Sequence, residues 1–360
     1  MTERPLSFIP GPSKIDDAVY RDIEIAMVGG ILELSHRSRE FVAIANQSIE
    51  NLRAYLGVPD DYAVLYTDSA SSAWHSMIAN VVDEKCAHVV TGAFSAKAVY
   101  ASRVLGKDAL EYRVDLKGED PHFPTIIDPG AELITVCYSE SSNGSAWTHA
   151  ELEQLRRQTD GLIAVDVTSC AGAIQLDLTL ADIWYFSVQK AFGLPAGLGV
   201  LILSPKVLAR ARARTEKGSN IAGMWSWSEL VEHQEHGRGP TPHTPNMLGI
   251  YLLAKRSARF LHEGGLSVID AATMRKAEQL YKHFGNHPHF SPYIPHANYR
   301  SPTVIAIAGA SDTIADAHQR AKEHGMVLGQ GYAELKDTTL RIANFPAITD
   351  EDVDRLLSWI

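Results

Sequence analysis

The chain has 360 residues, of which 45% are hydrophobic and 21% charged, an ordinary composition for a globular enzyme of one large or two smaller domains. A formal net charge of −10 without any basic cluster argues against nucleic acid as a partner. No run of about 18 apolar residues occurs and the first residues lack the apolar core of a signal peptide, so we expect a cytoplasmic protein that does not bind membranes.

Short apolar runs alternate with amphipathic helical stretches through the first two thirds of the chain. Expected strands cover residues 62–66, 88–91, 133–138, 163–167, 183–188 and 200–203. One of the expected helices, over 150–159, has Thr148 as a possible cap. This alternation predicts an α/β fold with a mainly parallel sheet covered by helices on both faces.

The last third of the sequence predicts a smaller α/β domain. A long helix over 244–262 leads into it, with Thr244 as N-cap and Pro245 at the first helical position. Further strands are expected at 303–307, 326–328 and 339–342, and helices at 315–324 and 350–359.

Three cysteines, Cys86, Cys137 and Cys170, lie among apolar or small residues. They form neither a CxxC pair nor a metal-binding spacing with histidines. We expect buried free thiols in a reducing compartment, and no bound metal.

Lys190 and Asp166 carry the strongest chemical signal. Lys190 lies between an apolar strand and a loop rich in Gly and Pro, and Asp166 ends the preceding apolar strand. A lone lysine would usually be a solvated loop residue, and a lone aspartate a turn residue. Together they offer an amine for a Schiff base and a carboxylate for a ring nitrogen, which is what pyridoxal phosphate requires. Parallel strands would bring both to one edge of the sheet.

With these residues in place, the chain resembles a class V, fold-type I pyridoxal-phosphate aminotransferase, and within that family it is most similar to the phosphoserine aminotransferases. The likeness runs from Phe8 to Phe345, and its most specific pieces are Ser35-His-Arg, the Asp166 strand, Gln189-Lys190 and Arg341. It implies a large domain, 15–258, with a mainly parallel sheet of the seven-stranded type. A small α/β domain, 259–360, would follow, with residues 1–14 packed on it.

The resemblance also implies which residues hold pyridoxal 5'-phosphate. Lys190 and Asp166 would be catalytic, and Phe94 would stack on the ring. Ser71 and Ser72, at a helix start whose free N–H groups suit an anion, would bind the phosphate. The other implied contacts are Ser141, Ser169, Gln189 and, across the interface of a homodimer, His243 and Thr244. Taken singly, the serines also suit helix caps or turns, and Phe94 suits a core position.

For the substrate, the resemblance implies that Arg341 binds the α-carboxylate. It also implies that His36 and Arg37 bind the phosphate of a substrate held in the neighbouring subunit. Taken alone, these side chains also suit a structural ion pair and a solvated helix start. The sequence departs from the phosphoserine pattern twice. Ser72 occupies the place of an arginine, and no additional phosphate-binding histidine is found in 330–336.

We therefore expect transamination between O-phospho-L-serine and 2-oxoglutarate in serine biosynthesis, by a homodimer with active sites at the subunit interface. The two departures leave an alternative open, a class V aminotransferase for another small pair such as alanine or serine with glyoxylate. A cysteine desulfurase is disfavoured, because none of the cysteines lies in a stretch typical of a mobile loop. The intact Lys190–Asp166 pair disfavours a non-catalytic binding protein.

Overall fold

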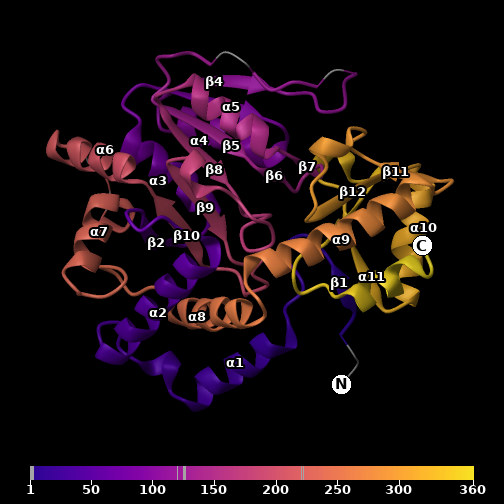
Figure 1. Ribbon diagram of the computed structural model, residues 1–360, viewed down its shortest axis with the longest axis horizontal. Coiled ribbons are helices and arrows are strands. Elements are labelled where there is room, and N and C mark those ends of the chain that lie inside the picture. Colours follow the sequence, from indigo (N-terminus) through magenta and orange to yellow (C-terminus); the bar gives the residue numbers. More distant parts are fainter. Residues whose placement is uncertain (1–3, 120, 125–126, 220, 222) are drawn as a thin grey trace.

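The computed structural model describes residues 4–119, 121–124, 127–219, 221 and 223–360, so the first three residues of the predicted segment 1–14 lie outside it. Its larger sheet has seven strands in the order β2-β10-β9-β8-β5-β3-β4 (Figure 1). The strands are β2 (Ala63–Thr67), β3 (Lys85–Val90), β4 (Asp108–Arg113), β5 (Leu133–Cys137), β8 (Leu162–Asp166), β9 (Ile183–Ser187) and β10 (Gly199–Leu203). Strand β10 runs antiparallel to both neighbours and the other pairings are parallel, which confirms the predicted mainly parallel sheet.

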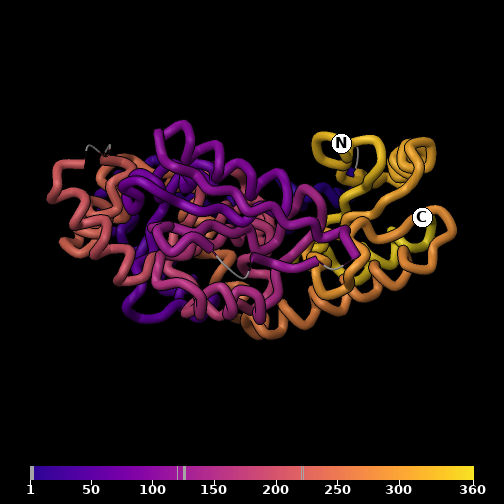
Figure 2. The backbone as a smooth tube through the Cα atoms, turned by 90° about the horizontal axis from the view of Figure 1, so that it is seen from above, coloured from indigo at the N-terminus to yellow at the C-terminus, as the bar shows by residue number. Residues whose placement is uncertain are grey.

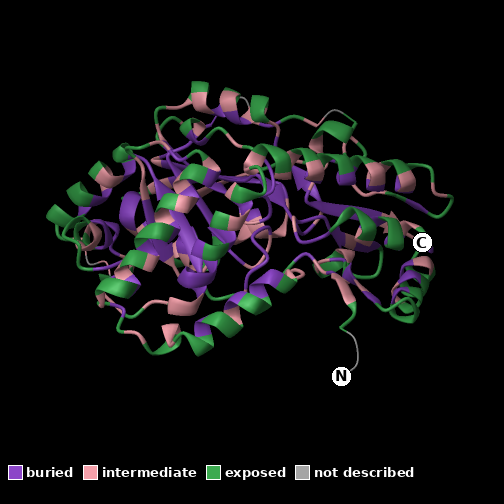
Figure 3. Cartoon of the chain, turned by 60° about the horizontal axis from the view of Figure 1, so that its bottom comes forward, coloured by how far each residue is buried: buried purple, intermediate pink, exposed green. Residues whose placement is uncertain are grey.

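Both faces of this sheet are buried, because successive side chains of each central strand enter different cores. In β9, Trp184 and Phe186 belong to one core, whereas Ile183 and Tyr185 belong to the other. The first core is covered by α1 (Asp17–Val28), α2 (Arg39–Leu56), α5 (His149–Gln158) and α8 (Met247–His262). The second is covered by α3 (Ala70–Val81), α4 (Ala93–Val104), α6 (Pro205–Glu216) and α7 (Trp227–Glu235). The strands are accordingly the buried centre of the molecule, under helices with exposed outer faces (Figure 3).

A second sheet of five strands, in the order β1-β13-β14-β12-β11, forms the smaller unit. Its strands are β1 (Leu6–Phe8), β11 (Phe290–Pro292), β12 (Val304–Gly309), β13 (Met326–Gln330) and β14 (Thr339–Ala343). The helices α9 (Leu266–Gly285), α10 (Ser311–Glu323) and α11 (Asp350–Leu357) pack on it. A short hairpin, β6 (Ser139–Glu140) with β7 (Ser145–Ala146), completes the strands of the described residues.

The first strand of the chain belongs to this second sheet. β1 pairs in parallel with β13, with Leu6 opposite Met326, so the described start of the chain belongs with its C-terminal third, which is coloured orange to yellow in Figure 2. This pairing supports the division into 15–258 and 259–360 with residues 4–14 attached to the small domain, which we keep as a proposal. The boundary at 258 falls inside α8.

Most expected elements are confirmed to within a few residues, and the exceptions have local causes. The expected start of α8 at Thr244 is wrong, because Asn246 is the N-cap and its Oδ1 accepts the Gly249 N–H at 2.9 Å. By contrast, Thr148 caps α5 as expected, in a reciprocal capping box with Glu151. The three cysteines are buried and free, as expected. Among the described residues, no helix combines the length and apolar character needed to cross a membrane.

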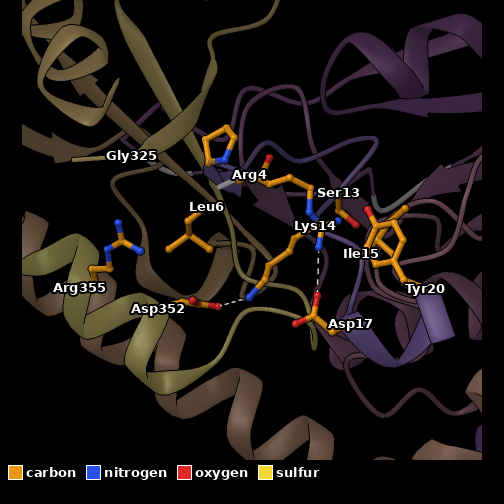
Figure 4. Close-up of a pocket in the computed structure, with 12 residues that line it drawn as sticks. Arg4, Leu6, Ser13, Lys14, Ile15, Asp17, Tyr20, Gly325, Asp352 and Arg355 are labelled. Atoms are coloured by element: carbon orange, nitrogen blue, oxygen red, sulfur yellow. Dashed lines mark hydrogen bonds and ion pairs between the residues drawn. The ribbon is translucent and has the colours of Figure 1, made fainter. Parts of the chain in front are cut away.

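A crevice of about 530 Å³ opens where the N-terminal segment meets α1 and α11 (Figure 4). Four of its charged side chains form ion pairs, Lys14 with Asp352 at 2.5 Å and Arg4 with Asp17 at 3.1 Å, and Arg355 donates to the His324 carbonyl oxygen at 2.7 Å. Ser13, which lines the crevice, donates its hydroxyl to the Lys190 carbonyl oxygen at 2.7 Å. The N-terminal segment is thereby tied both to the small domain and to the loop that carries Lys190.

Lys276 of α9 gives the small domain a pH-dependent stability. The side chain is 3% exposed, its amine donates to the Ile348 carbonyl oxygen, and burial lowers its pKa to about 8. Between this value and the 10.5 of an unperturbed lysine, only the unfolded state carries the proton, so stability rises with pH. We expect the wild type to gain about 3 kcal/mol over Lys276→Met across that interval, measured by denaturant unfolding at several pH values. The exposed Lys282→Met on the same helix should show no such trend, and a pH-independent difference for Lys276→Met would contradict the argument.

Candidate active site

Lys190 and Asp166 meet in one cavity at the carboxyl ends of neighbouring parallel strands. Asp166 is the last residue of β8, and Lys190 follows the end of β9 by three residues. Seven of the predicted site residues line this cavity together: Ser71, Phe94, Ser141, Asp166, Ser169, Gln189 and Lys190. The position agrees with the rule that ligands bind beyond the carboxyl ends of parallel strands.

The amine of Lys190 is held by hydroxyl groups. Nζ donates to Ser141 Oγ at 2.6 Å and to Ser169 Oγ at 2.9 Å, and no ion pair joins it to a carboxylate of the described residues. Burial lowers the pKa of this amine, and the more distant charge of Asp166 only partly opposes the shift. The neutral amine is therefore available at lower pH than in a solvated lysine, as a nucleophile and proton acceptor require.

Asp166 is a buried carboxyl group, 6% exposed. Its Oδ1 accepts the Thr168 N–H at 2.9 Å. Burial raises the pKa of the carboxyl group, and the Thr168 hydrogen bonds and Lys190 oppose that shift. A buried carboxylate of this kind is stabilised by a cationic partner, which the protonated ring nitrogen of pyridoxal phosphate would supply. The lysine, the carboxyl group and the hydroxyl donors therefore fit this cofactor.

Phe94 lies in the first turn of α4, with its ring centre 4.9 Å from Lys190 Nζ. The ring also packs on Tyr332, centre to centre at 5.1 Å. An aromatic ring in this position suits stacking on a planar cofactor.

The two predicted phosphate-binding serines have different surroundings. Ser71 lines the cavity at the start of α3, where the first-turn N–H groups have no partners within the helix. Ser72 does not line it, because its hydroxyl forms the capping box with Ser69 and contacts Thr67 Oγ1 at 3.0 Å. The structure thus gives Ser72 a helix-capping role, and its contact with a phosphate stays a prediction.

Glu140 is a structural determinant of the site that the sequence reasoning missed. Its carboxylate is fully buried and accepts the backbone N–H groups of Phe94 and Ser95, at 3.1 and 2.9 Å, at the N-terminus of α4. It also accepts the Ser142 hydroxyl at 2.7 Å. The approach is so close that a Cβ on Gly92 would lie 2.4 Å from Glu140 Cγ. One carboxylate thus fixes the helix start that carries Phe94 and the turn that carries Ser141.

Trp74 and Ser187 also line the cavity and were not expected there. Trp74 lies three residues after Ser71, on the same face of α3, and this spacing was the signal available in the sequence. Ser187 accepts the Ala70 N–H at 2.7 Å, so it holds the first residue of α3 against the end of β9.

Arg341, on β14 of the small sheet, does not line the cavity but contacts the backbone of Ser141, which does. One guanidinium nitrogen, Nη1, donates to the Ser141 carbonyl oxygen at 2.8 Å and Nε donates to the Gln330 carbonyl oxygen at 2.6 Å. No carboxylate of the described residues forms an ion pair with the Arg341 guanidinium. Burial lowers the pKa of this group. The structural ion pair that the sequence left open is therefore absent from the described residues.

The remaining predicted residues, His36, Arg37, His243 and Thr244, form a separate cluster that does not line the Lys190 cavity. His36 Nδ1 lies 3.3 Å from Thr244 Oγ1, and Arg37 donates to the Pro242 carbonyl oxygen at 3.2 Å. Burial, followed by the charge of Arg37, lowers the pKa of His36. That these side chains serve the site of a second subunit stays a prediction.

Comparison with known proteins places this geometry in a family. The sequence profile of the family described as "Aminotransferase class-V" matches residues 10–356. A crystal structure of a phosphoserine aminotransferase from Cytophaga hutchinsonii is 31% identical, with a TM-score of 0.93 over 98% of this chain and 97% of that one. A protein named phosphoserine aminotransferase from Nocardioides is 26% identical over 371 residues, covering 98% of this chain and 94% of its own length. An alanine–glyoxylate aminotransferase from Nostoc, 19% identical, shares the fold with a TM-score of 0.81 over 99% of this chain and 94% of that one.

Replacement of Glu140 should disturb both stability and the site. In Glu140→Gln an amide NH₂ group would face N–H donors, so we expect a loss of about 2–4 kcal/mol in the free energy of unfolding and a fall in turnover. Denaturant titration and steady-state kinetics measure the two effects. Glu153→Gln removes an exposed ion pair with Arg157 and serves as the control, with an expected change below about 0.5 kcal/mol. An unchanged Glu140→Gln protein would contradict the role given to this carboxylate.

Proposed function

The chain belongs to the class V aminotransferase family and uses pyridoxal phosphate, and we propose that it transfers the amino group between O-phospho-L-serine and 2-oxoglutarate, giving 3-phosphohydroxypyruvate and glutamate. The relatives named phosphoserine aminotransferase support this choice. The three cysteines are buried and free, which suits the proposed cytoplasmic location and its reducing conditions.

The observation that carries the choice is a cluster of one arginine and three histidines with no carboxylate partner among the described residues. Arg37 and His36 lie near His233 and His243, whose charges contribute to the lowered pKa of His36. Buried ring nitrogens of His36 and His243 have no hydrogen-bond partner. A phosphate group would satisfy such donors, since Arg and His pair well with its oxygens.

Each residue in and beside the cavity has a separate role in the proposed reaction. Pyridoxal phosphate, when bound, supplies the electron sink that acidifies the substrate Cα. The neutral amine of Lys190 would accept the proton from the substrate Cα and pass it on to the cofactor, and in the second half-reaction it would deliver a proton to Cα of the product amino acid. Asp166 holds the proton on the ring nitrogen, Phe94 limits the tilt of the ring, and Arg341 orients the α-carboxylate.

We further propose that the active protein is a homodimer in which His36, Arg37, His243 and Thr244 complete the site of the partner subunit. Support comes from the separation of this cluster from the Lys190 cavity of its own chain. Twofold dimers are also the commonest symmetric assembly of soluble proteins.

The alternative is a class V aminotransferase for alanine or serine with glyoxylate. It is favoured by Ser72, whose hydroxyl caps α3 and places no cation at the start of that helix.

The substrate assignment is tested by mixing the cofactor-loaded protein with phosphoserine, serine or alanine, each without an oxo acid. Each amino donor that reacts removes the visible absorption band of the bound cofactor. We expect rapid bleaching by phosphoserine and much slower bleaching by the other two. Bleaching by serine or alanine but not by phosphoserine would establish the alternative instead.

The shared site is tested by mixing two inactive variants, Lys190→Ala and Arg37→Ala. A dimer that contains one subunit of each has one intact site, so an equal mixture should recover up to about a quarter of wild-type activity with phosphoserine. Each variant alone should stay nearly inactive, and co-purification of differently tagged subunits verifies that mixed dimers form. Verified mixed dimers without recovered activity would refute the exchange of residues between subunits.

A further inference from the structure

Lys97 is a second lysine beside the Lys190 cavity: it does not line the cavity but contacts Phe94, which does, and it has no place in the sequence predictions. It lies three residues after Phe94 on α4, so both side chains share one face of the helix. Lys97 Nζ lies 4.6 Å from the centre of the Phe94 ring, and Lys190 Nζ lies 4.9 Å from the same centre. Two amines therefore lie next to one aromatic ring.

Tyr332 holds Lys97 from the small domain. Lys97 Nζ donates to the Tyr332 hydroxyl at 3.1 Å. The centre of the Tyr332 ring lies 5.6 Å from Lys97 Nζ and 5.6 Å from Arg341 Cζ. The two cationic groups are thus arranged around one tyrosine, at the junction of the two domains.

The loop that carries Tyr332 has a constrained backbone. Ala333 has a φ of 50°, and it is the non-glycine residue with positive φ in the described part of the chain. A Cβ on Gly331 would lie 1.9 Å from the Leu335 carbonyl oxygen. Strained backbone of this kind is retained where a side chain must be held in place, and here it holds the Tyr332 ring.

Lys97 is half-buried, and its amine forms no ion pair with a carboxylate of the described residues. An amine held by two rings and a hydroxyl group retains donors for an anionic ligand. Arg341 similarly has no carboxylate partner in the described chain. Two such cations suit a substrate with two acidic groups.

We propose that Lys97, positioned by Tyr332, binds the second acidic group of the substrate while Arg341 binds its α-carboxylate. That group is the phosphate of phosphoserine in one half-reaction and the side-chain carboxylate of glutamate in the other. The inference rests on the proposed function. Lys97 would be a cation from the same subunit, at a site where Ser72 carries no charge.

The test uses half-reactions of the cofactor-loaded protein with phosphoserine, glutamate and alanine, followed by rapid-mixing absorbance. Lys97→Met keeps the alkyl stem against Phe94 but removes the charge. It should raise the half-saturating concentration of phosphoserine and glutamate about tenfold to a hundredfold, relative to alanine as the internal reference. Lys97→Arg should restore most of this loss, and Tyr332→Phe, which frees the amine but keeps the ring, should give a smaller effect of the same kind.

Lys336→Met is the matched control, because it removes an exposed lysine from the same loop and should leave selectivity unchanged. Equal losses for alanine and the diacids in Lys97→Met would overturn the proposal and leave Lys97 a packing role beside Phe94. If the wild type fails with phosphoserine but reacts with glutamate, the proposed function falls while the glutamate-to-alanine comparison still decides the role of Lys97. A wild type that reacts with neither diacid refutes both.

Discussion

The carboxylate of Glu140 is the contact on which the geometry of the site depends. It is buried without an ion pair to any described residue, and backbone and hydroxyl donors from α4 and from the β6–β7 turn surround it. Because a buried charge is tolerated only when its hydrogen bonds are made, these donors cannot move without a large cost in free energy. This one carboxylate therefore helps to position Phe94 and Ser141. Through the Ser141 carbonyl oxygen it also helps to position Arg341.

The cavity beside Glu140 contains ionisable groups that have no partner of opposite charge in direct contact among the described residues. The Lys190 amine contacts hydroxyl groups, and Asp166 contacts the Thr168 N–H. Burial shifts the pKa of both groups toward the neutral form. Such a site is costly for the protein alone, and it is suited to a ligand that brings a cationic ring nitrogen to one residue and an aldehyde to the other.

The sequence predicted the central strands and the pair Asp166 and Lys190, because fully buried parallel strands are continuous apolar runs. It did not predict β4, whose sequence Asp-Ala-Leu-Glu-Tyr-Arg is that of a half-exposed edge strand. Glu140 was missed for a different reason. Its partners come from α4, about 45 residues away in the sequence, and no local pattern separates a buried glutamate from a solvated one. Ser72 shows the converse, since local chemistry alone explains its place in a capping box.

The pairing of β1 with β13 has a consequence for how the chain is made. Leu6 leaves the ribosome long before its neighbour Met326 is synthesised. Domains generally fold as units during synthesis, so the seven-stranded sheet can form while the first strand still lacks its sheet. Ser13, which bonds to the Lys190 carbonyl oxygen, follows that strand directly. The segment beside Lys190 is therefore anchored late, and a nascent chain short of residue 326 lacks the strand that anchors it.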